Sequence, residues 1–104
     1  MKNQGFEIVQ GQSSRGVKFI LKGHVNSINS SELEKTLEQA LNNGEINIVL
    51  NMLRVDYLSS AGIKVILKAF KDTQKAGGSL GIEGPSENVR NVLGMTALDR
   101  LLIK

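Results

Sequence analysis

The stretch Val55–Ile63, which reads VDYLSSAGI, joins a strand-like segment directly to the first turn of an amphipathic helix. The residues before it, 46–52, are largely apolar, which is typical of a strand that is covered on both faces. The residues after it, 62–75, carry Ile66 and Phe70 on one helical side, which predicts that this side packs on the sheet. A strand that runs straight into a helix begins a strand–helix–strand unit, so the stretch predicts a parallel sheet.

Two serines, Ser59 and Ser60, stand at the junction between the expected strand and the expected helix. The first N–H groups of a helix have no partner within the helix, and the helix dipole makes that end electropositive. A serine there can therefore cap the helix, which is worth about 0.5–2 kcal/mol, or it can carry a phosphate. The sequence alone leaves both interpretations open for Ser60, and it does not decide which of the two serines is the cap.

Two short β-like runs, Phe6–Gln10 and Val17–Lys22, precede this unit and flank the turn-like residues 11–16. They predict a β-hairpin, which is followed by a polar loop over residues 23–29. The chain therefore opens with two antiparallel strands before strands and helices begin to alternate.

The remaining elements follow from local signals. Ser31 and Glu34 have the spacing of a capping box and predict the start of the first helix. A short strand is expected at Leu80–Glu83, a third helix capped by Ser86 comes next, and Leu101–Ile103 is expected to form a last edge strand. The order ββαβαβα predicts one α/β domain over residues 1–104. Its sheet is expected to be mixed but mostly parallel, with four to five strands, an opening hairpin and helices packed on it.

Composition limits the classes of protein that this chain can represent. Cysteine is absent and the only histidine is His24, so neither a disulfide framework nor a metal site is expected. No apolar run approaches the roughly 20 residues of a membrane span, and residues 1–5 lack the apolar core of a signal peptide. The expectation is a cytoplasmic protein that does not bind membranes.

The net charge of +3 raises the question of nucleic acid, but the lysines of the helix expected over residues 62–75 argue against it. They recur as on the solvated face of an amphipathic helix, without interleaved aromatic residues: Lys64, Lys68, Lys71 and Lys75. Catalysis is not expected either, because no base or paired carboxylate is obviously placed beside Ser59 or Ser60. The sequence therefore predicts no enzyme, no cofactor and no direct binding of nucleic acid.

Taken together, these residues resemble the STAS domain family, whose best-known members are bacterial anti-sigma factor antagonists. Four segments carry the resemblance, in the order that the family has: Leu21–Asn26, Ile48–Ile63, Lys75–Leu80 and Gly84–Leu98. Within the second segment, Ser60 matches by position the serine that is phosphorylated in the family. Two residues depart from the family pattern, since Ser59 and Asn26 stand where the family usually has aspartate.

The resemblance implies a function in partner switching. An antagonist of this family binds an anti-sigma factor that is also a serine kinase of the GHKL type, and thereby releases a sigma factor. The kinase phosphorylates the loop serine, here Ser60 with Ser59 as the alternative, and a phosphatase opposes it. The resemblance also implies a monomer or weak homodimer, and it places the partner-binding residues at Asn26, Ser27, Leu58, Ser59, Ser60, Ala61, Gly62 and Lys64.

Two alternatives stand beside this interpretation. The chain can instead be a STAS subunit with a structural role, as in a signalling scaffold or an ABC-type lipid transport complex. For Asn26 and Ser27, loop and cap chemistry is the alternative to contact with a partner.

Overall fold

The chain opens with the predicted antiparallel hairpin, formed by β1 (Phe6–Ser13) and β2 (Gly16–Val25), in a computed structural model that describes residues 6–96 and 98–102. Gly16 closes the turn with φ 140, and a Cβ atom there would lie 2.2 Å from the carbonyl oxygen of Asn47. Both strands are longer than the sequence predicted, and residues 23–25, expected in a loop, belong to β2. Cross-strand pairing extends the strands beyond their apolar runs, because backbone hydrogen bonds do not require apolar side chains.

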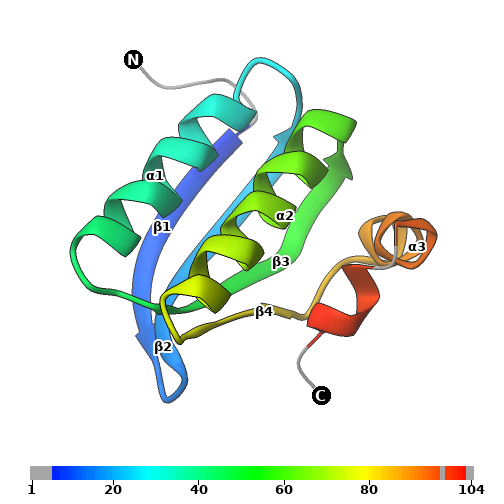
Figure 1. The fold of residues 1–104 in the computed structure, drawn as a ribbon. Coiled ribbons are helices and arrows are strands. Elements are labelled where there is room, and N and C mark those ends of the chain that lie inside the picture. The colour runs from blue at the N-terminus through cyan, green and yellow to red at the C-terminus, as the bar shows by residue number, and fades with distance from the viewer. Residues whose placement is uncertain (1–5, 97, 103–104) are drawn as a thin grey trace.

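Two further strands, β3 (Asn47–Leu58) and β4 (Ser79–Glu83), complete the sheet within the described residues, in the order β1-β2-β3-β4. β2, β3 and β4 run parallel, so the predicted mixed and mostly parallel sheet is confirmed with four strands. The crossover helices α1 (Ser30–Asn42) and α2 (Ser60–Lys75) both lie on one face (Figure 1). Each connects neighbouring strands in the same direction across the sheet, and right-handed crossovers then put both on the same side.

The third helix, α3 (Glu87–Met95), begins at the predicted cap, where Ser86 Oγ accepts a hydrogen bond from the N–H of Val89. The edge strand expected at Leu101–Ile103 was wrong for Leu101, which ends a 3₁₀ turn over Leu98–Leu101. Only Leu102 pairs with β4, through a single bridge to Ile82, and Ile103 lies outside the described residues. Winding into a turn buries the side chains of Leu98 and Leu101.

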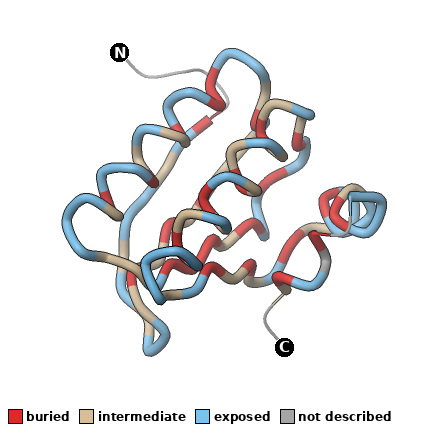
Figure 2. The backbone as a smooth tube through the Cα atoms, viewed as in Figure 1, coloured by how far each residue is buried: buried red, intermediate tan, exposed pale blue. Residues whose placement is uncertain are grey.

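Most of the core lies between the sheet and the two crossover helices, and it continues to α3 and the 3₁₀ turn; buried residues occur in all of these elements (Figure 2). Leu21, Leu50 and Ile66 are fully buried there. Ile66 therefore packs on the sheet as its spacing predicted. Phe70 is only half-buried, because it lies one turn nearer the end of α2, with the guanidinium carbon of Arg100 5.7 Å from its ring centre.

Candidate functional site

The carboxyl ends of β2 and β3 bring two strand-to-helix connections together at one edge of the sheet. Val25 is the register partner of Leu58, and the N–H of Ser59 donates a hydrogen bond to the carbonyl oxygen of Val25 at 2.8 Å. Residues 26–29 and the start of α2 therefore leave the sheet side by side. Ligands of open α/β sheets bind outside the carboxyl ends of the strands, so this edge is a candidate functional site.

The two serines at the start of α2 have different structural roles. Ser59 is the N-cap, with an extended backbone (φ −79, ψ 169), and its Oγ accepts a hydrogen bond from the N–H of Gly62 at 3.2 Å. Ser60 is the first helical residue and is exposed. Among the described residues, no hydrogen bond engages the Ser60 hydroxyl. The cap, which the sequence left open between the two serines, is thus Ser59, and Ser60 presents a free hydroxyl at an electropositive helix end.

We expect the two serines to differ in their contribution to stability. Ser59→Ala removes the acceptor for the N–H of Gly62 and should lower the free energy of unfolding by about 0.5–2 kcal/mol. Ser60→Ala should change it by about 0.5 kcal/mol or less, as is usual for exposed positions without a specific contact. Urea melts of the two variants measure both values. Equal losses would show that the cap is shared or misassigned.

Leu58 and Gly62 shape this junction from the inside. Both are buried, and a Cβ atom at Gly62 would lie 2.7 Å from Val25 Cγ1 and 2.9 Å from Leu58 Cδ1. Glycine therefore lets the first turn of α2 pack closely against the strand ends. Of the predicted partner-binding residues, these two position Ser59 and Ser60, whereas Lys64 is exposed and Ala61 is half-buried.

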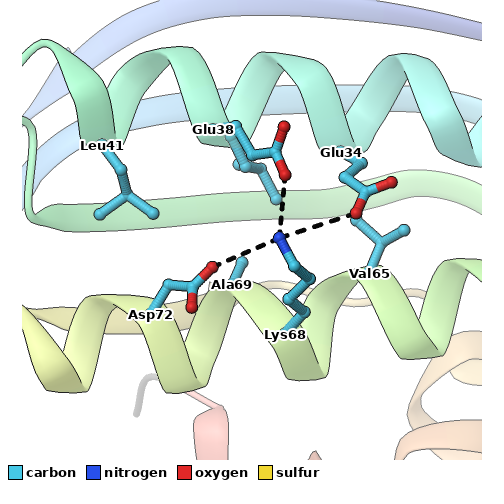
Figure 3. A pocket seen from close by; sticks show the side chains of 8 residues that line it. Glu34, Glu38, Leu41, Val65, Lys68, Ala69 and Asp72 are labelled. Carbon is cyan, nitrogen blue, oxygen red and sulfur yellow. Dashed lines mark hydrogen bonds and ion pairs between the residues drawn. The ribbon is translucent and has the colours of Figure 1, made fainter.

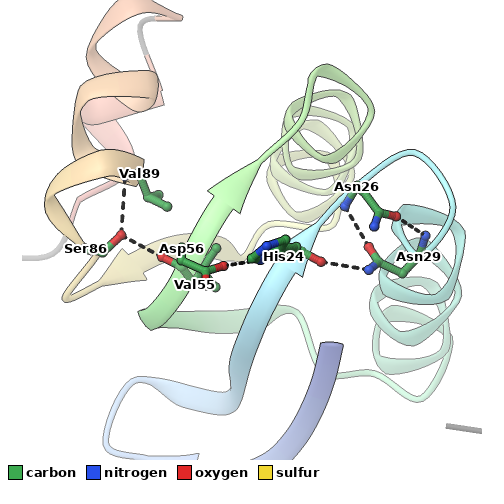
Figure 4. Close-up of polar contacts among 7 residues, drawn as sticks. All are labelled: His24, Asn26, Asn29, Val55, Asp56, Ser86 and Val89. Carbon is green, nitrogen blue, oxygen red and sulfur yellow. Dashed lines mark hydrogen bonds and ion pairs between the residues drawn. The ribbon is translucent and has the colours of Figure 1, made fainter. Parts of the chain in front are cut away.

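The loop between β2 and α1 is held by reciprocal hydrogen bonds between two asparagines (Figure 4). Asn26 Oδ1 accepts from the N–H groups of Ile28 and Asn29, both at 2.9 Å, and Asn29 Oδ1 accepts from the N–H of Asn26 at 2.9 Å. Asn29 Nδ2 also donates to the carbonyl oxygen of His24 at 2.7 Å. Asn26 thus makes an Asx turn, in which the aspartate usual in the family would offer an equivalent acceptor oxygen. Ser27, also predicted to bind a partner, is exposed in this loop.

The capping box predicted from Ser31 and Glu34 does not form. α1 begins at Ser30 with Asn29 at the N-cap position, where no side-chain cap bond is made. The Ser31 hydroxyl instead donates to the carbonyl oxygen of Ile28 at 3.3 Å, and Glu34 turns towards α2. The asparagine pair already orders the chain before the helix, and the N-cap position lies two residues earlier than the capping box predicted.

A contact between β2 and β3 that sequence reasoning missed lies just before this loop. His24 Nδ1 contacts a carboxylate oxygen of Asp56, and the ring of His24 meets that of Tyr57 edge-on, with 6.2 Å between ring centres. The two partners are 32 positions apart and both side chains are 61% exposed, so only strand register brings them together. The β2–β3 register shifts between Gly23 and His24, which leaves Asp56 as an extra residue beside His24.

A second missed contact ties α3 to the same strand. The hydroxyl of Ser86 donates to the carbonyl oxygen of Val55 at 2.6 Å, one residue before Asp56 (Figure 4). Ser86 therefore both caps α3 and fixes it to the strand that carries the serine junction. No local signal in the sequence could have revealed this bond.

The groove between α1 and α2 is lined by apolar side chains of both helices and by charged side chains around one ammonium group (Figure 3). Lys68 Nζ lies 2.9 Å from Glu38, 3.6 Å from Asp72 and 3.7 Å from Glu34. The hydrogen bond to Glu38 raises the pKa of Lys68 above its usual value, and the three carboxylates add to that effect.

The predicted lysine face of α2 is exposed as expected, at Lys64, Lys68, Lys71 and Lys75.

Across residues 6–96 and 98–102, no three His, Asp or Glu side chains come together as metal ligands would. No helix in that part of the chain combines the length and apolar character needed to cross a membrane.

Known proteins resemble this chain in sequence. The family model of the STAS domain matches residues 9–104. The BtrV protein of Bordetella bronchiseptica, named as a candidate anti-sigma factor antagonist, is 39% identical over 72 residues, which make up 69% of this chain and 62% of that protein. A candidate anti-sigma factor antagonist of Thermotoga maritima is 32% identical over 65 residues, which make up 62% of this chain and 58% of that protein. These matches span less than two thirds of the length of either relative.

Solved structures resemble it in fold. The anti-sigma factor antagonist SpoIIAA in its unphosphorylated form has a TM-score of 0.83 and 18% identity, over 93% of this chain and 86% of that chain. A crystal structure of the Thermotoga maritima protein, itself a candidate antagonist, has a TM-score of 0.78 and 26% identity, over 91% of this chain and 82% of that chain. The SpoIIAA likeness concerns the fold alone, whereas the family model covers most of the sequence. The chain belongs to the STAS domain family.

Proposed function

We propose that this chain is an anti-sigma factor antagonist whose binding is switched by phosphorylation of Ser60. One observation carries the proposal: Ser59 caps α2, while Ser60 presents an exposed hydroxyl that the described residues leave unbonded. A phosphate on Ser60 therefore does not require the helix cap to break. The names of the relatives from Bordetella bronchiseptica and Thermotoga maritima support the choice of an anti-sigma factor as partner.

The charge of a phosphate explains how such a switch works without unfolding the protein. Phosphorylation adds about −1.5 to −2 charges at neutral pH. At the first residue of α2, the positive end of the helix dipole and the free N–H groups favour that charge within this chain. A partner surface that covers Ser60 must instead bury the charge, which costs several kcal/mol unless a cation matches it. The unmodified protein is therefore the binding form.

The proposed partner is a serine kinase of the GHKL type that is itself the anti-sigma factor, with a phosphatase in opposition. Binding by this chain, as a monomer or weak homodimer in the cytoplasm, releases a sigma factor. The SpoIIAA protein has been solved in an unphosphorylated and in a phosphorylated form, which supports a fold that tolerates the modification. The two residues that depart from the family pattern both have a structural role in this chain. Asn26 makes the Asx turn, and Ser59 caps α2.

The test begins with the immobilised protein and a lysate of the organism that encodes it. We expect the unmodified chain to retain an anti-sigma factor. With ATP and Mg²⁺, that protein should add one phosphate to Ser60, as read by phosphopeptide mapping. Ser59→Ala is the matched control and should still be phosphorylated, whereas Ser60→Ala should not.

Two results would contradict the proposal, one for the phosphorylated residue and one for the antagonist function. Phosphate that persists in Ser60→Ala and disappears in Ser59→Ala would move the switch to the cap residue. Retention of scaffold or transporter subunits without any anti-sigma factor would instead favour the structural assembly role.

A further inference from the structure

The sheet packs against α1 and α2 on one face, and the opposite face, on the far side in Figure 1, is named the open face here. Side chains alternate along a strand, so the residues that alternate with core residues belong to the open face. They are Lys18, Ile20 and Lys22 of β2, Val49 and Asn51 of β3, and their register partners Glu7, Val9, Gly11, Gly81 and Glu83. A mostly parallel sheet is normally covered on both faces, which is also what the apolar run over residues 46–52 predicted.

The middle of the open face can be covered at low cost, because its polar groups bond one another. Lys18 of β2 reaches across β3 to Glu83 of β4, with Nζ 2.9 Å from the carboxylate, and Asn51 Nδ2 donates to the same carboxylate at 2.8 Å. The hydrogen bonds from Lys18 and Asn51 hold the pKa of Glu83 below its usual value. Val49 is the register partner of Lys18 and is only 2% exposed, since the stem of Lys18 passes over it. A partner that covers this ion pair therefore buries no unmatched charge.

Beside the ion pair, three aliphatic side chains form a row across β1, β2 and β3, named the aliphatic row: Val9, Ile20 and Leu53. Val9 is 38% exposed and is the register partner of the half-buried Ile20. Leu53 is 63% exposed, and its N–H donates to Oδ1 of Asn51, the register partner of Ile20, at 3.3 Å. Contiguous apolar side chains with a polar rim are typical of interaction sites, whereas single ones are not.

A bulge in β3 turns two neighbouring side chains, Leu53 and Arg54, towards the open face. Met52 before them and Val55 after them are both 0% exposed, so the two residues between point away from the core. The register of β2 and β3 shifts at this point, which leaves one extra residue on β3. Bulges of this kind are common beside functional sites, where they redirect a side chain.

Two cations flank the aliphatic row. Lys22 and Arg54 are register partners, and neither makes an ion pair with another described residue. Like charges on neighbouring strands repel each other, and a carboxylate between them would pair with both. Glu7 of β1 is the other register partner of Lys22 and lies on the side away from Arg54. Asp56, further along β3, is engaged by His24.

We propose that the open face is a docking site for an amphipathic acidic helix of a second protein, whose apolar stripe packs on the aliphatic row and whose carboxylate lies between Lys22 and Arg54. Helices are the elements that cover the faces of parallel sheets in α/β proteins. A second copy of this chain fits less well, because a two-fold related copy brings its own pair of cations to the same patch. The docking site goes beyond the proposed function, since it involves neither Ser59 nor Ser60.

The test uses two synthetic helical peptides of about 18 residues, long enough to cross a four-stranded sheet. They share a leucine stripe and differ only in its flanks, which carry glutamate in one peptide and lysine in the other. The complete chain, isotopically labelled, is titrated with each peptide and followed by amide chemical shifts and calorimetry. We expect the glutamate peptide to shift amides around the aliphatic row, with an affinity that falls as salt is raised. The lysine peptide should bind about tenfold more weakly or less.

Two variants with matched controls locate the contact. Leu53→Ser should weaken binding of the glutamate peptide about tenfold, because it removes the most exposed side chain of the aliphatic row. Its control is Ile28→Ser, which changes a residue 77% exposed in the loop between β2 and α1 and should bind unchanged. Arg54→Gln should weaken binding and reduce its salt dependence, whereas Lys71→Gln, on α2 at the other face of the sheet, should do neither. Circular dichroism melts check that all four variants keep the fold.

The docking site is overturned if the glutamate peptide does not bind, or if the two peptides bind equally well. Equal losses in Leu53→Ser and Ile28→Ser, or amide shifts confined to α1 and α2, would also overturn it. If sedimentation shows that the unmodified protein self-associates and that Leu53→Ser does not, a second copy is the occupant and the acidic helix is wrong. None of these measurements involves phosphate or the anti-sigma factor, so the docking site and the proposed function are tested separately.

Discussion

One phosphate on Ser60 is expected to weaken binding of the anti-sigma factor by about 100-fold or more while the fold stays intact. Ser60 is exposed at the first residue of α2, and its hydroxyl makes no hydrogen bond with another described residue, so phosphorylation breaks no such bond. The same phosphate lies where the partner must come into contact, and burial of an unmatched charge there costs several kcal/mol. Because each 1.4 kcal/mol is a factor of ten in affinity, two decades follow from a modest penalty.

The measurement pairs calorimetric titration with thermal melts of the enzymatically phosphorylated protein. Ser60→Asp should show the same direction with a smaller effect, because a carboxylate carries less charge than a phosphate. Ser14→Asp is the control, because Ser14 is exposed in the turn between β1 and β2. That turn lies at the start of β2, whereas the junction with Ser60 lies beside the end of β2. Ser14→Asp adds the same charge and should leave affinity unchanged. If phosphorylated, folded protein binds the anti-sigma factor as tightly as unmodified protein does, the proposed switch is wrong.

Ile66→Ala is expected to cause a large loss of stability, about 2–5 kcal/mol. Ile66 lies in the middle of α2 with 0% of its side chain exposed, among the core residues between helix and sheet. The truncation removes buried apolar surface and leaves a cavity that packed neighbours fill only in part. A domain of this size is stable by only about 5–15 kcal/mol, so the variant should melt at a much lower urea concentration.

Lys71→Ala is the matched control on the same helix. Lys71 is exposed and makes no ion pair with another described residue. Its replacement should change the free energy of unfolding by about 0.5 kcal/mol or less. Similar urea midpoints for the two variants would mean that α2 presents a different face to the sheet.

Local signals predicted much of the fold. The apolar run before Val55–Ile63 and the helical spacing of Ile66 after it predicted β3, α2 and a parallel sheet, all of which the structure contains. Such signals are local, because side chains return to the same face about every two residues in a strand and about every 3.6 residues in a helix. The capping box of Ser31 and Glu34 did not form, because the Ser31 hydroxyl bonds the nearby loop carbonyl of Ile28 and Glu34 pairs with Lys68 of the neighbouring helix.

The sequence by itself also determined that Ser59 and Ser60 stand at the entrance to a helix, because the change from strand to helix pattern falls there. Only the tertiary structure decided which serine is the cap and which is free, since that depends on the backbone angles of Ser59. The neighbours of this junction were likewise beyond local prediction. The parallel register of β2 and β3 brings Val25 beside Ser59 and His24 beside Asp56, and pairing between residues more than 30 positions apart leaves no periodic trace in the sequence.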